Sequence, residues 1–374
     1  MSWTTSSVGE LADVAIGPFG SSMKADSYVQ EGLPVVAGGH LGDLRHPDMT
    51  RADRISEETA TRLARSVLES GDLVFPHRGA IGRVGLVADR SMMSTSMMRA
   101  RFNPEKVDAE FAYWYFKADG CSQLLTMASS VGTPGIGQPL ASLKSVQMRV
   151  PSLVEQRGIA EVLNALEDKM AANRVVSDRA DELLCAWARE ARSEVSMVRL
   201  GSLLSLNYGR ALPAPNRNGG NVVVVGSGGV AGYHDVKLVD GPVLVIGRKG
   251  TVGATHWIDG PAFPIDTTYW VKPHDGLPLL YLYYLLRDID FAAMNHDSAV
   301  PGLNREQAYT VEVPAPNQEL VAKFAEKSAG LLALRSARKR ESEVLARTRD
   351  ELLPLLMSGK ITVKQGETRA EEVV

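Results

Sequence analysis

The most regular hydrophobic pattern in the chain lies in residues 151–190, and no glycine or proline occurs between Gly158 and Gly201. Apolar residues recur there at alternating spacings of four and three, which predicts one face of a long helix. At about 1.5 Å per residue, this helix would be roughly 50–60 Å long. Two interpretations are open, a long core helix and a spacer between two globular parts. The apolar positions are Ile159, Leu163, Leu166, Met170, Ala180, Leu184 and Trp187, and Asn173 and Ser177 interrupt them.

Short apolar runs broken by glycine and proline fill most of the remaining chain, and they predict short strands. A second long helical pattern begins at Gln318 and ends at about Pro354. The tail from Lys360 is polar, and we expect it to be disordered. The predicted strands are residues 33–37, 72–75, 84–88, 97–102, 222–225, 243–246 and 267–271, and two short helices are expected at residues 108–117 and 279–286.

The two halves of the chain repeat each other. Three short motifs recur 167 to 171 residues later, whereas a fourth pair, beginning at Gly9 and Gly201, is 192 residues apart. The larger offset places roughly 20 extra residues between about Ser21 and Gly71. The three motifs are Gly79-Ala-Ile-Gly82 with Gly250-Thr-Val-Gly253, Pro134-Gly135-Ile136 with Pro301-Gly302-Leu303, and Asp181-Glu-Leu-Leu184 with Asp350-Glu-Leu-Leu353.

The repeat predicts an α+β fold. Two mixed α/β modules would be separated by two long, antiparallel, coiled-coil-like helices in a pseudo-twofold arrangement. The apolar positions of the first helix would pack on the second, with Asn173 as a candidate register residue. Such an object suits a nearly twofold partner, and duplex DNA is the commonest one. The expected division is residues 1–150 and 197–316 for the modules, 151–196 and 317–359 for the spacer helices, and 360–374 for the disordered tail.

Length and composition narrow the class of protein. The chain has 374 residues, which is enough for two or more domains. Its net charge of −3 argues against a uniformly basic nucleic-acid binder but allows local basic faces. Cys121 and Cys185 form no CxxC motif, which predicts neither a disulfide framework nor a zinc site. We see no signal peptide and no apolar run near the ~20 residues of a membrane span, so we expect a cytoplasmic protein.

Several segments, in this order, resemble the specificity (S) subunits of type I restriction-modification systems. The resemblance covers about residues 8–365. The second half departs from it in one place, because Pro314 to Glu319 has no clean Glu-Gln-Arg sequence at the head of its helix. The segments that carry the resemblance are Gly71–Gly82 and Gly247–Gly253, Pro151 with Glu155-Gln156-Arg157, and Leu352–Ile361.

The resemblance implies a DNA-binding subunit with two target-recognition domains, each reading one half of a bipartite target. The helices would set the gap between the half-sites and dock two methyltransferase subunits, and many such systems also contain two restriction subunits. No cofactor is expected on this chain, since S-adenosylmethionine would bind the methyltransferase partner. The target bases do not carry over, because the recognition domains vary most within the family.

Basic residues beside the glycine motifs are the first candidate DNA contacts. Glycine permits close approach of the backbone, and arginine can bind a phosphate or guanine O6 and N7. Tight β-turns without any further role are the alternative. Arg99 and Arg101 alternate with apolar neighbours, so they share one face of a strand. The candidates are His77, Arg78, Arg83, Arg99, Arg101, Arg210, Tyr233, His234, Arg248 and Lys249.

No catalytic or metal site is expected, since we find no HExxH, GxSxG, Walker A or Cys/His cluster in the sequence. Residues 222–232 resemble a dinucleotide-binding fingerprint, which requires a helix directly after its glycines. Only about nine residues separate Gly232 from Pro242, too few for a crossover helix. A glycine turn between strands is therefore favoured. The alternatives are a nucleotide-dependent enzyme that uses the Gly226–Gly232 loop, and a scaffold that bridges two proteins without touching DNA.

Overall fold

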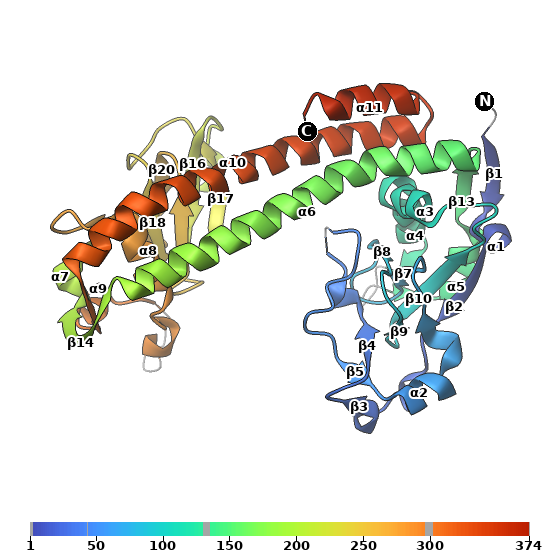
Figure 1. Cartoon of the computed structure of the whole chain (residues 1–374), viewed down its shortest axis with the longest axis horizontal. Helices are drawn as coiled ribbons and strands as arrows, with labels where there is room; N and C mark the ends of the chain where they lie inside the picture. Colours follow the sequence, from blue (N-terminus) through green and yellow to red (C-terminus); the bar gives the residue numbers. More distant parts are fainter. Residues whose placement is uncertain (1–2, 43, 130–134, 296–301, 374) are drawn as a thin grey trace. The chain divides into compact units, whose positions relative to one another are not determined.

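The computed structural model describes residues 3–42, 44–129, 135–295 and 302–373. The chain divides into two compact units. Unit 1 consists of Met1–Asn173 and Arg340–Val374, and unit 2 of Arg174–Lys339. Each unit therefore contains one globular module and a part of each long helix (Figure 1).

Unit 1 is built on a four-stranded antiparallel sheet of order β2-β10-β7-β8. A second, mixed sheet has the order β3-β5-β4-β9-β6, with β4 and β9 parallel. Two further strand pairs are β1-β13 and β11-β12. The strands are β1 (Thr4–Ser7), β2 (Ala12–Ile16), β3 (Tyr28–Val29), β4 (Leu33–Val36), β5 (Arg54–Ile55), β6 (Val67–Leu68), β7 (Leu73–Pro76), β8 (Gly85–Leu86), β9 (Ser91–Met93), β10 (Met97–Phe102), β11 (Ala128–Ser129), β12 (Gly135–Ile136) and β13 (Gln147–Val150).

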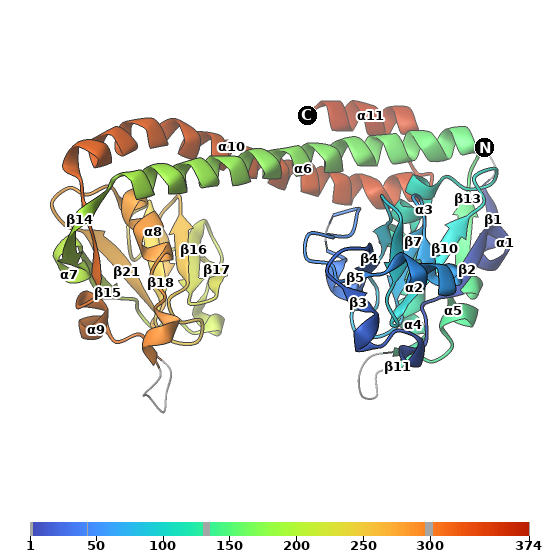
Figure 2. The same cartoon turned by 60° about the horizontal axis from the view of Figure 1, so that its bottom comes forward.

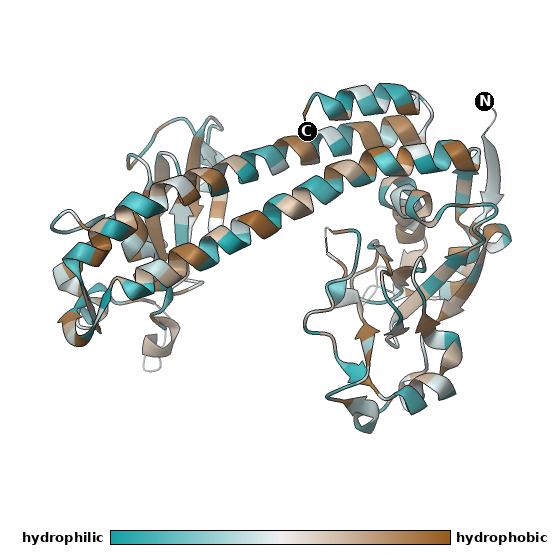
Figure 3. Ribbon diagram, viewed as in Figure 1, coloured by the Kyte–Doolittle hydropathy of each residue, from teal (hydrophilic) through white to brown (hydrophobic). Residues whose placement is uncertain are grey.

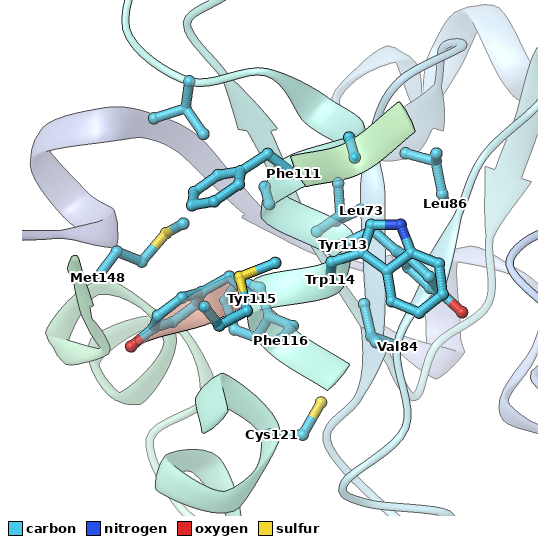
Figure 4. Packing of buried hydrophobic residues seen from close by; sticks show 14 of the residues in the cluster. Leu73, Val84, Leu86, Phe111, Tyr113, Trp114, Tyr115, Phe116, Cys121 and Met148 are labelled. Atoms are coloured by element: carbon cyan, nitrogen blue, oxygen red, sulfur yellow. The ribbon is translucent and has the colours of Figure 1, made fainter. Parts of the chain in front are cut away.

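Helix α3 (Ala109–Tyr115) fills the core of unit 1. Asp108 caps it by accepting hydrogen bonds from the backbone amides of Glu110 and Phe111 at 3.0 and 3.1 Å. Figure 4 shows its aromatic side chains packed against the four-stranded sheet, and Trp114 is fully buried. The other helices of the module are α1 (Val8–Leu11), α2 (Glu57–Arg62), a π-helical turn (Phe116–Gly120), α4 (Cys121–Thr126) and α5 (Pro139–Ser145).

Unit 2 has the same central topology, with an antiparallel sheet of order β15-β21-β18-β19 (Figure 2). A three-stranded sheet, β17-β16-β20, and the pair β14-β22 complete its strands. They are β14 (Arg192–Arg199), β15 (Leu204–Tyr208), β16 (Val222–Gly226), β17 (Gly229–His234), β18 (Val243–Gly247), β19 (Thr255–Ile258), β20 (Ala262–Pro264), β21 (Thr268–Pro273) and β22 (Glu312–Pro316), with helices α7 (Leu200–Leu203), α8 (Leu279–Arg287) and α9 (Arg305–Tyr309).

The two sheets confirm the internal repeat. Chain order and strand order agree element by element, so β2, β7, β8 and β10 correspond to β15, β18, β19 and β21. The modules differ where the sequence offset changes. Unit 1 has a five-stranded sheet, in which β3 to β6 come before β7 in the chain and β9 comes after β8. Unit 2 has the three-stranded sheet of β16, β17 and β20 instead. The expected extra residues between Ser21 and Gly71 include β3, β4, β5 and β6.

The long helices α6 (Leu153–Glu190) and α10 (Gln318–Met357) run antiparallel within each unit. In unit 1, Asn173 Nδ2 donates to Ser342 Oγ at 3.4 Å and is buried, as expected of a register residue. In unit 2, Arg335 Nη1 lies 2.8 Å from Asp181 Oδ1. The predicted seam packs on α10, since Leu163 shares a core with Leu345 in unit 1 and residues such as Leu184 share one with Phe324 in unit 2.

Two sequence expectations about the ends of the long helices are wrong. The tail after Lys360 is not disordered, because α11 (Val363–Glu371) forms there. Thr362 caps α11 in a capping box with Gln365, and its buried Gly366 and Ala370 pack on the helix pair, which accounts for its order. Helix α6 ends at Glu190, so the last residues assigned to the first spacer, from Arg192, belong to β14.

The helices alternate hydrophobic and hydrophilic residues along their length (Figure 3). None of the helices in the described ranges combines the length and apolar content that a membrane span requires.

Candidate nucleic-acid interface

Equivalent glycine turns connect β7 to β8 and β18 to β19. Gly79 and Gly82 have φ angles of 77° and 86°, and Gly250 and Gly253 have φ angles of 81° and 79°. Residues that carry a side chain rarely adopt such positive φ angles, so these turns require glycine. The two turns also share one internal hydrogen bond, from Ile81 N and from Val252 N to the carbonyl of the first glycine.

The second repeated motif pairs with the first in both units. In unit 1, Arg78 and Gly135 form a β-bridge, and Ile136 N donates to the carbonyl of His77 at 2.9 Å. In unit 2, Lys249 and Gly302 form the same bridge, and Leu303 N donates to the carbonyl of Arg248 at 2.8 Å. Each unit therefore presents two adjoining loop segments, which we call the two-loop platform: residues 77–83 with 135–138 in unit 1, and residues 248–254 with 302–305 in unit 2. Pro134 and Pro301 of these motifs lie outside the described residues.

The unit 1 platform presents two of its three predicted contacts to solvent. Arg78 and Arg83 are exposed, and Arg83 Nη1 donates to the carbonyl of Leu41 at 2.7 Å. His77 is only 5% exposed, and its Nε2 lies 3.3 Å from the carbonyl of Thr95. Burial lowers the pKa of His77. The histidine is therefore an internal residue, and its burial does not fit the DNA contact expected from the sequence.

Arg99 and Arg101 share one face of β10, as the alternation predicted, but both guanidinium groups are used within unit 1. Arg99 is buried and forms an ion pair with Asp13 of β2. Arg101 forms two hydrogen bonds of 2.7 Å with the buried carboxylate of Asp72. One partner of each pair is buried, Arg99 in the first and Asp72 in the second, and a buried charge requires such a partner. This pairing does not fit the expected DNA contacts.

The unit 2 platform surrounds an exposed aromatic ring. Tyr208, at the end of β15, is 52% exposed, and the Cζ atoms of Arg248 and Arg305 each lie 5.3 Å from its ring centroid. Tyr269 of β21 lies next to it, with ring centroids 5.1 Å apart, and donates its hydroxyl to the carbonyl of Leu303 at 3.1 Å. Burial raises the pKa of Tyr269 to about 12. The group forms an exposed cation–aromatic cluster.

The three remaining candidates lie elsewhere in unit 2. Arg210 is exposed in the loop after β15, where it forms a bridge with Ile265. Tyr233 is 53% exposed on the edge strand β17, whereas its neighbour His234 is only 8% exposed. The Nδ1 atom of His234 lies 3.2 Å from Asp235. Arg210 and Tyr233 are therefore accessible to a ligand, and the burial of His234 does not fit a direct contact.

The glycines of residues 226–232 form a hairpin between β16 and β17. The two strands pair antiparallel from Val222–His234 to Gly226–Gly229. Strand β17 thus occupies the position where a dinucleotide site needs the N-terminus of a helix. The geometry required by the nucleotide-binding alternative is absent from this segment.

Each module is attached to its long helices by a cluster of charged residues. In unit 2, the carboxylate of Asp181 on α6 accepts hydrogen bonds of 2.8 Å from Tyr284, Arg287 and Arg335. Burial opposes ionisation of Asp181, but the bonds from Arg287 and Tyr284 outweigh it and lower the pKa. We call these four residues the Asp181 cluster. It joins α6, α8 and α10.

Unit 1 has a related cluster at the same junction. Glu167 on α6 lies 3.7 Å from Arg349 of α10 and 4.0 Å from Arg45, which reaches the helix from the loop before β5. Arg45 also forms a 2.8 Å ion pair with Asp168. Burial raises the pKa of Glu167, and the arginines offset this effect in part. Tyr113 of α3, the counterpart of Tyr284, adjoins the cluster.

The sequence alone did not predict a role for Tyr208, Arg305 or the two junction clusters. Tyr208 ends an ordinary strand, and Arg305 lies two residues after the repeated Pro301-Gly302-Leu303 motif and not in it, so only the fold brings them beside Arg248. Of the cluster residues, Asp181 belongs to a repeated motif, but its partners on α8 and α10 are more than a hundred residues away. No group of three or more His, Cys, Asp or Glu side chains in the described ranges is arranged to hold a metal ion.

Comparison with known proteins finds similarity to type I specificity subunits and their DNA specificity domain. Residues 2–176 match the family described as type I restriction modification DNA specificity domain. The type I restriction enzyme MjaIX specificity subunit of Methanocaldococcus jannaschii is 25% identical over 191 residues, which are 50% of this chain and 43% of the relative. The match therefore spans less than half the length of that curated relative.

A solved structure extends the likeness in fold along the chain. The crystal structure of the type I restriction-modification S subunit from M. genitalium has a TM-score of 0.65 with this chain at 19% identity, and the alignment covers 95% of this chain and 96% of that one. At this identity the likeness concerns the fold. Residues 2–176 thus match the DNA specificity domain of type I restriction-modification systems, and the chain as a whole has the fold of a solved S subunit.

Proposed function

We propose that this chain recognises a bipartite DNA sequence, with each module reading one half-site. The observation that carries the proposal is the two-loop platform, which recurs in both units with exposed cations beside glycine turns. Glycine lets the platform approach the duplex closely, and base edges are distinguishable in the major groove. The accessible candidates are Arg78 and Arg83 in unit 1, and Arg210, Tyr233, Arg248 and Lys249 in unit 2.

In this proposal the helix pair is both a spacer and a docking surface. The length of α6 and α10 would set the gap between the half-sites, and two methyltransferase subunits would bind the helices. The chain itself would act as a non-catalytic subunit. The methyltransferase partner would bind S-adenosylmethionine and transfer the methyl group, and restriction subunits would join in systems that cleave. Equal docking at the two helix heads is not required, since only the first contains Glu155-Gln156-Arg157.

Buried Gln156 in that motif supports a structural role for the first helix head. Its side-chain oxygen accepts from the amide of Asp108 at 2.8 Å, and its side-chain nitrogen donates to the carbonyls of Lys106 and Pro151 at 3.0 and 2.9 Å. These bonds fix the start of α6 against the cap of α3. The recognition module and the spacer would therefore move as one body at this end.

Reconstitution with the methyltransferase encoded beside this chain tests the proposal. We expect the complex, and not the methyltransferase alone, to bind a target duplex with an affinity that falls steeply as salt rises. Affinity that is independent of this chain, or of duplex sequence, would contradict the proposal. A stable complex with the methyltransferase that ignores DNA would favour the bridging scaffold instead.

A further inference from the structure

The cation–aromatic cluster of unit 2 lines a pocket of about 390 Å³. Tyr208 and Tyr269 form its aromatic wall, and Arg248, Lys249 and Arg305 contribute the cations. The Cζ atoms of both guanidinium groups lie 5.3 Å from the centroid of the exposed Tyr208 ring. Three cationic side chains therefore converge on one open pocket.

The charge of this pocket is poorly neutralised by its own surroundings. Arg248 bonds to the backbone carbonyl of Asp266 through Nε at 3.2 Å and Nη2 at 2.8 Å, which positions the guanidinium without neutralising it. Within the described ranges, neither Arg248 nor Lys249 forms an ion pair with a carboxylate. Arg305 pairs at 3.1 Å with Glu306, the one acidic residue among those lining the pocket, and that carboxylate is 75% exposed. The residues that line the pocket therefore have the composition of an anion-binding site.

Unit 1 has the same backbone platform with other residues at the positions of this cluster. The strand register places Ile16 where unit 2 has Tyr208. The shared bridge places buried His77 where unit 2 has Arg248, and Gln138 follows Ile136 as Arg305 follows Leu303. Aromatic ring and flanking arginines are thus specific to unit 2. A role in building the platform cannot explain them, because unit 1 builds it without them.

The geometry favours a phosphate over a base edge. Reading guanine requires one free edge of a guanidinium group with two donors. Arg248 directs its Nε–Nη2 edge to the Asp266 carbonyl, which leaves the Nη1–Nη2 edge for a ligand, and its Cζ atom lies 5.3 and 5.8 Å from the ring centroids of Tyr208 and Tyr269. Three cations that converge on one pocket match an anion with several oxygen atoms better than they match a single base edge.

We propose that this pocket binds a backbone phosphate of the DNA duplex, with Arg248, Lys249 and Arg305 around the phosphate and Tyr208 against the adjoining deoxyribose. This inference rests on the proposed DNA-binding function and deepens it. Unit 2 supplies a non-sequence-specific anchor that unit 1 lacks. Phosphate contacts fix register and orientation but carry no sequence information, so losing the anchor should weaken binding while the target stays the same.

The test is the salt dependence of target binding by the complex with methyltransferase. Each neutralised phosphate contributes about 0.9 to the slope of log K against log salt, so Arg248→Ala with Arg305→Ala, which removes the contact to one phosphate, should reduce the slope by about 0.9. At about 0.15 M salt this slope change corresponds to roughly fivefold weaker binding. Methylome mapping should return an unchanged target. The charge-keeping pair Arg248→Lys with Arg305→Lys should retain the slope.

Two further variants separate the pocket from general effects. Lys237→Ala removes an exposed cation of unit 2 that has its own partner, Asp240 at 2.5 Å, and should leave affinity and slope unchanged. Tyr208→Phe should bind like the original chain because the ring remains, whereas Tyr208→Ala should weaken binding. Circular dichroism of each variant checks that unit 2 is folded.

Several outcomes would overturn the inference. An unchanged slope in the folded double alanine variant excludes the phosphate contact. A changed base in one half-site with the slope retained would make Arg248 a base-reading residue. Saturable binding of adenosine monophosphate that is lost in the same variant would assign the pocket to a free nucleotide. If the original complex itself shows no salt-dependent, sequence-specific binding, the proposed function fails before the pocket is in question.

Discussion

Replacing Asp181 with asparagine tests whether the Asp181 cluster holds unit 2 together at the junction of α6, α8 and α10. The carboxylate accepts three hydrogen bonds of 2.8 Å, two of them from arginines that the asparagine would leave without a counter-charge. Removing one member of a fully buried ion pair costs about 3–5 kcal/mol. Because the Asp181 side chain is 27% exposed, water screens part of this loss, and we expect about 2 kcal/mol.

Hydrogen exchange measured by mass spectrometry resolves this effect within the chain. A loss of about 2 kcal/mol corresponds to roughly 30-fold faster exchange in peptides from α8. Peptides from α3 in unit 1 serve as the internal reference and should not change. Asp178→Asn is the matched control, since its pair with Arg174 is 3.9 Å long and both side chains are more than two thirds exposed. It should alter exchange less than about threefold.

The pH dependence gives a second check on the same cluster. The pKa of Asp181 is lowered in the folded chain, so its stabilising contribution is fully present above the unfolded pKa of about 4. That contribution is lost as the pH falls through the lower, folded pKa. The difference between the original chain and Asp181→Asn should therefore be constant at neutral pH and shrink below about pH 4. Equal exchange in α8 for the Asp181 and Asp178 variants at neutral pH would refute this reasoning.

Three other changes probe the fold and the spacer. Inserting three heptads into both α6 and α10 keeps the phase of the apolar seam and lengthens each helix by about 32 Å, close to one duplex turn. Methylome mapping should then show a gap that is longer by about 9 base pairs between unchanged half-sites. Altered half-sites with the old gap would contradict the spacer role. Gly366→Val should expose α11 to limited proteolysis, because a Cβ added at Gly366 would lie 3.1 Å from the Leu356 side chain and overpacking costs about 1–3 kcal/mol. The control Glu367→Val changes an exposed residue and should leave α11 resistant. In urea unfolding, Tyr284→Phe should lower the free energy of unfolding by about 1.5–3 kcal/mol, because it removes the hydrogen bond to the Asp181 carboxylate. Tyr113→Phe should be nearly neutral, because the Tyr113 hydroxyl has no hydrogen-bond partner among the described residues. Equal losses in the two variants would contradict the role given to the Tyr284 hydroxyl.

The sequence predicted the repeat and the long helices because each depends on local signals. Residues 151–190, with their 4-3 apolar spacing, contain α6, and of the three motifs at nearly one offset two form equivalent turns and bridges while the third lies on α6 and α10. The tail after Lys360 was mispredicted because its composition is polar. Its order comes from Gly366 and Ala370 packing on the long helices, and a pattern of small residues gives no hydrophobic periodicity.

The candidate site was harder to predict than the fold. Basic side chains look alike in a sequence, yet Arg99 is buried in an ion pair with Asp13 whereas Arg78 is exposed. That distinction depends on partners from other strands. Tyr208 and Arg305 were missed for the same reason, since three separate segments bring them beside Arg248. Local spacing therefore located the platform but did not show which of its side chains are exposed.

The central claim, that the two modules read two separate half-sites, is tested most directly by mapping methylated adenines with long-read sequencing. Cells would express the methyltransferase with this chain, and a matched culture would express the methyltransferase alone. We predict two short specific half-sites separated by a gap of fixed length and no sequence preference, present only when this chain is expressed. A single continuous motif, or the same methylation without this chain, would contradict the account.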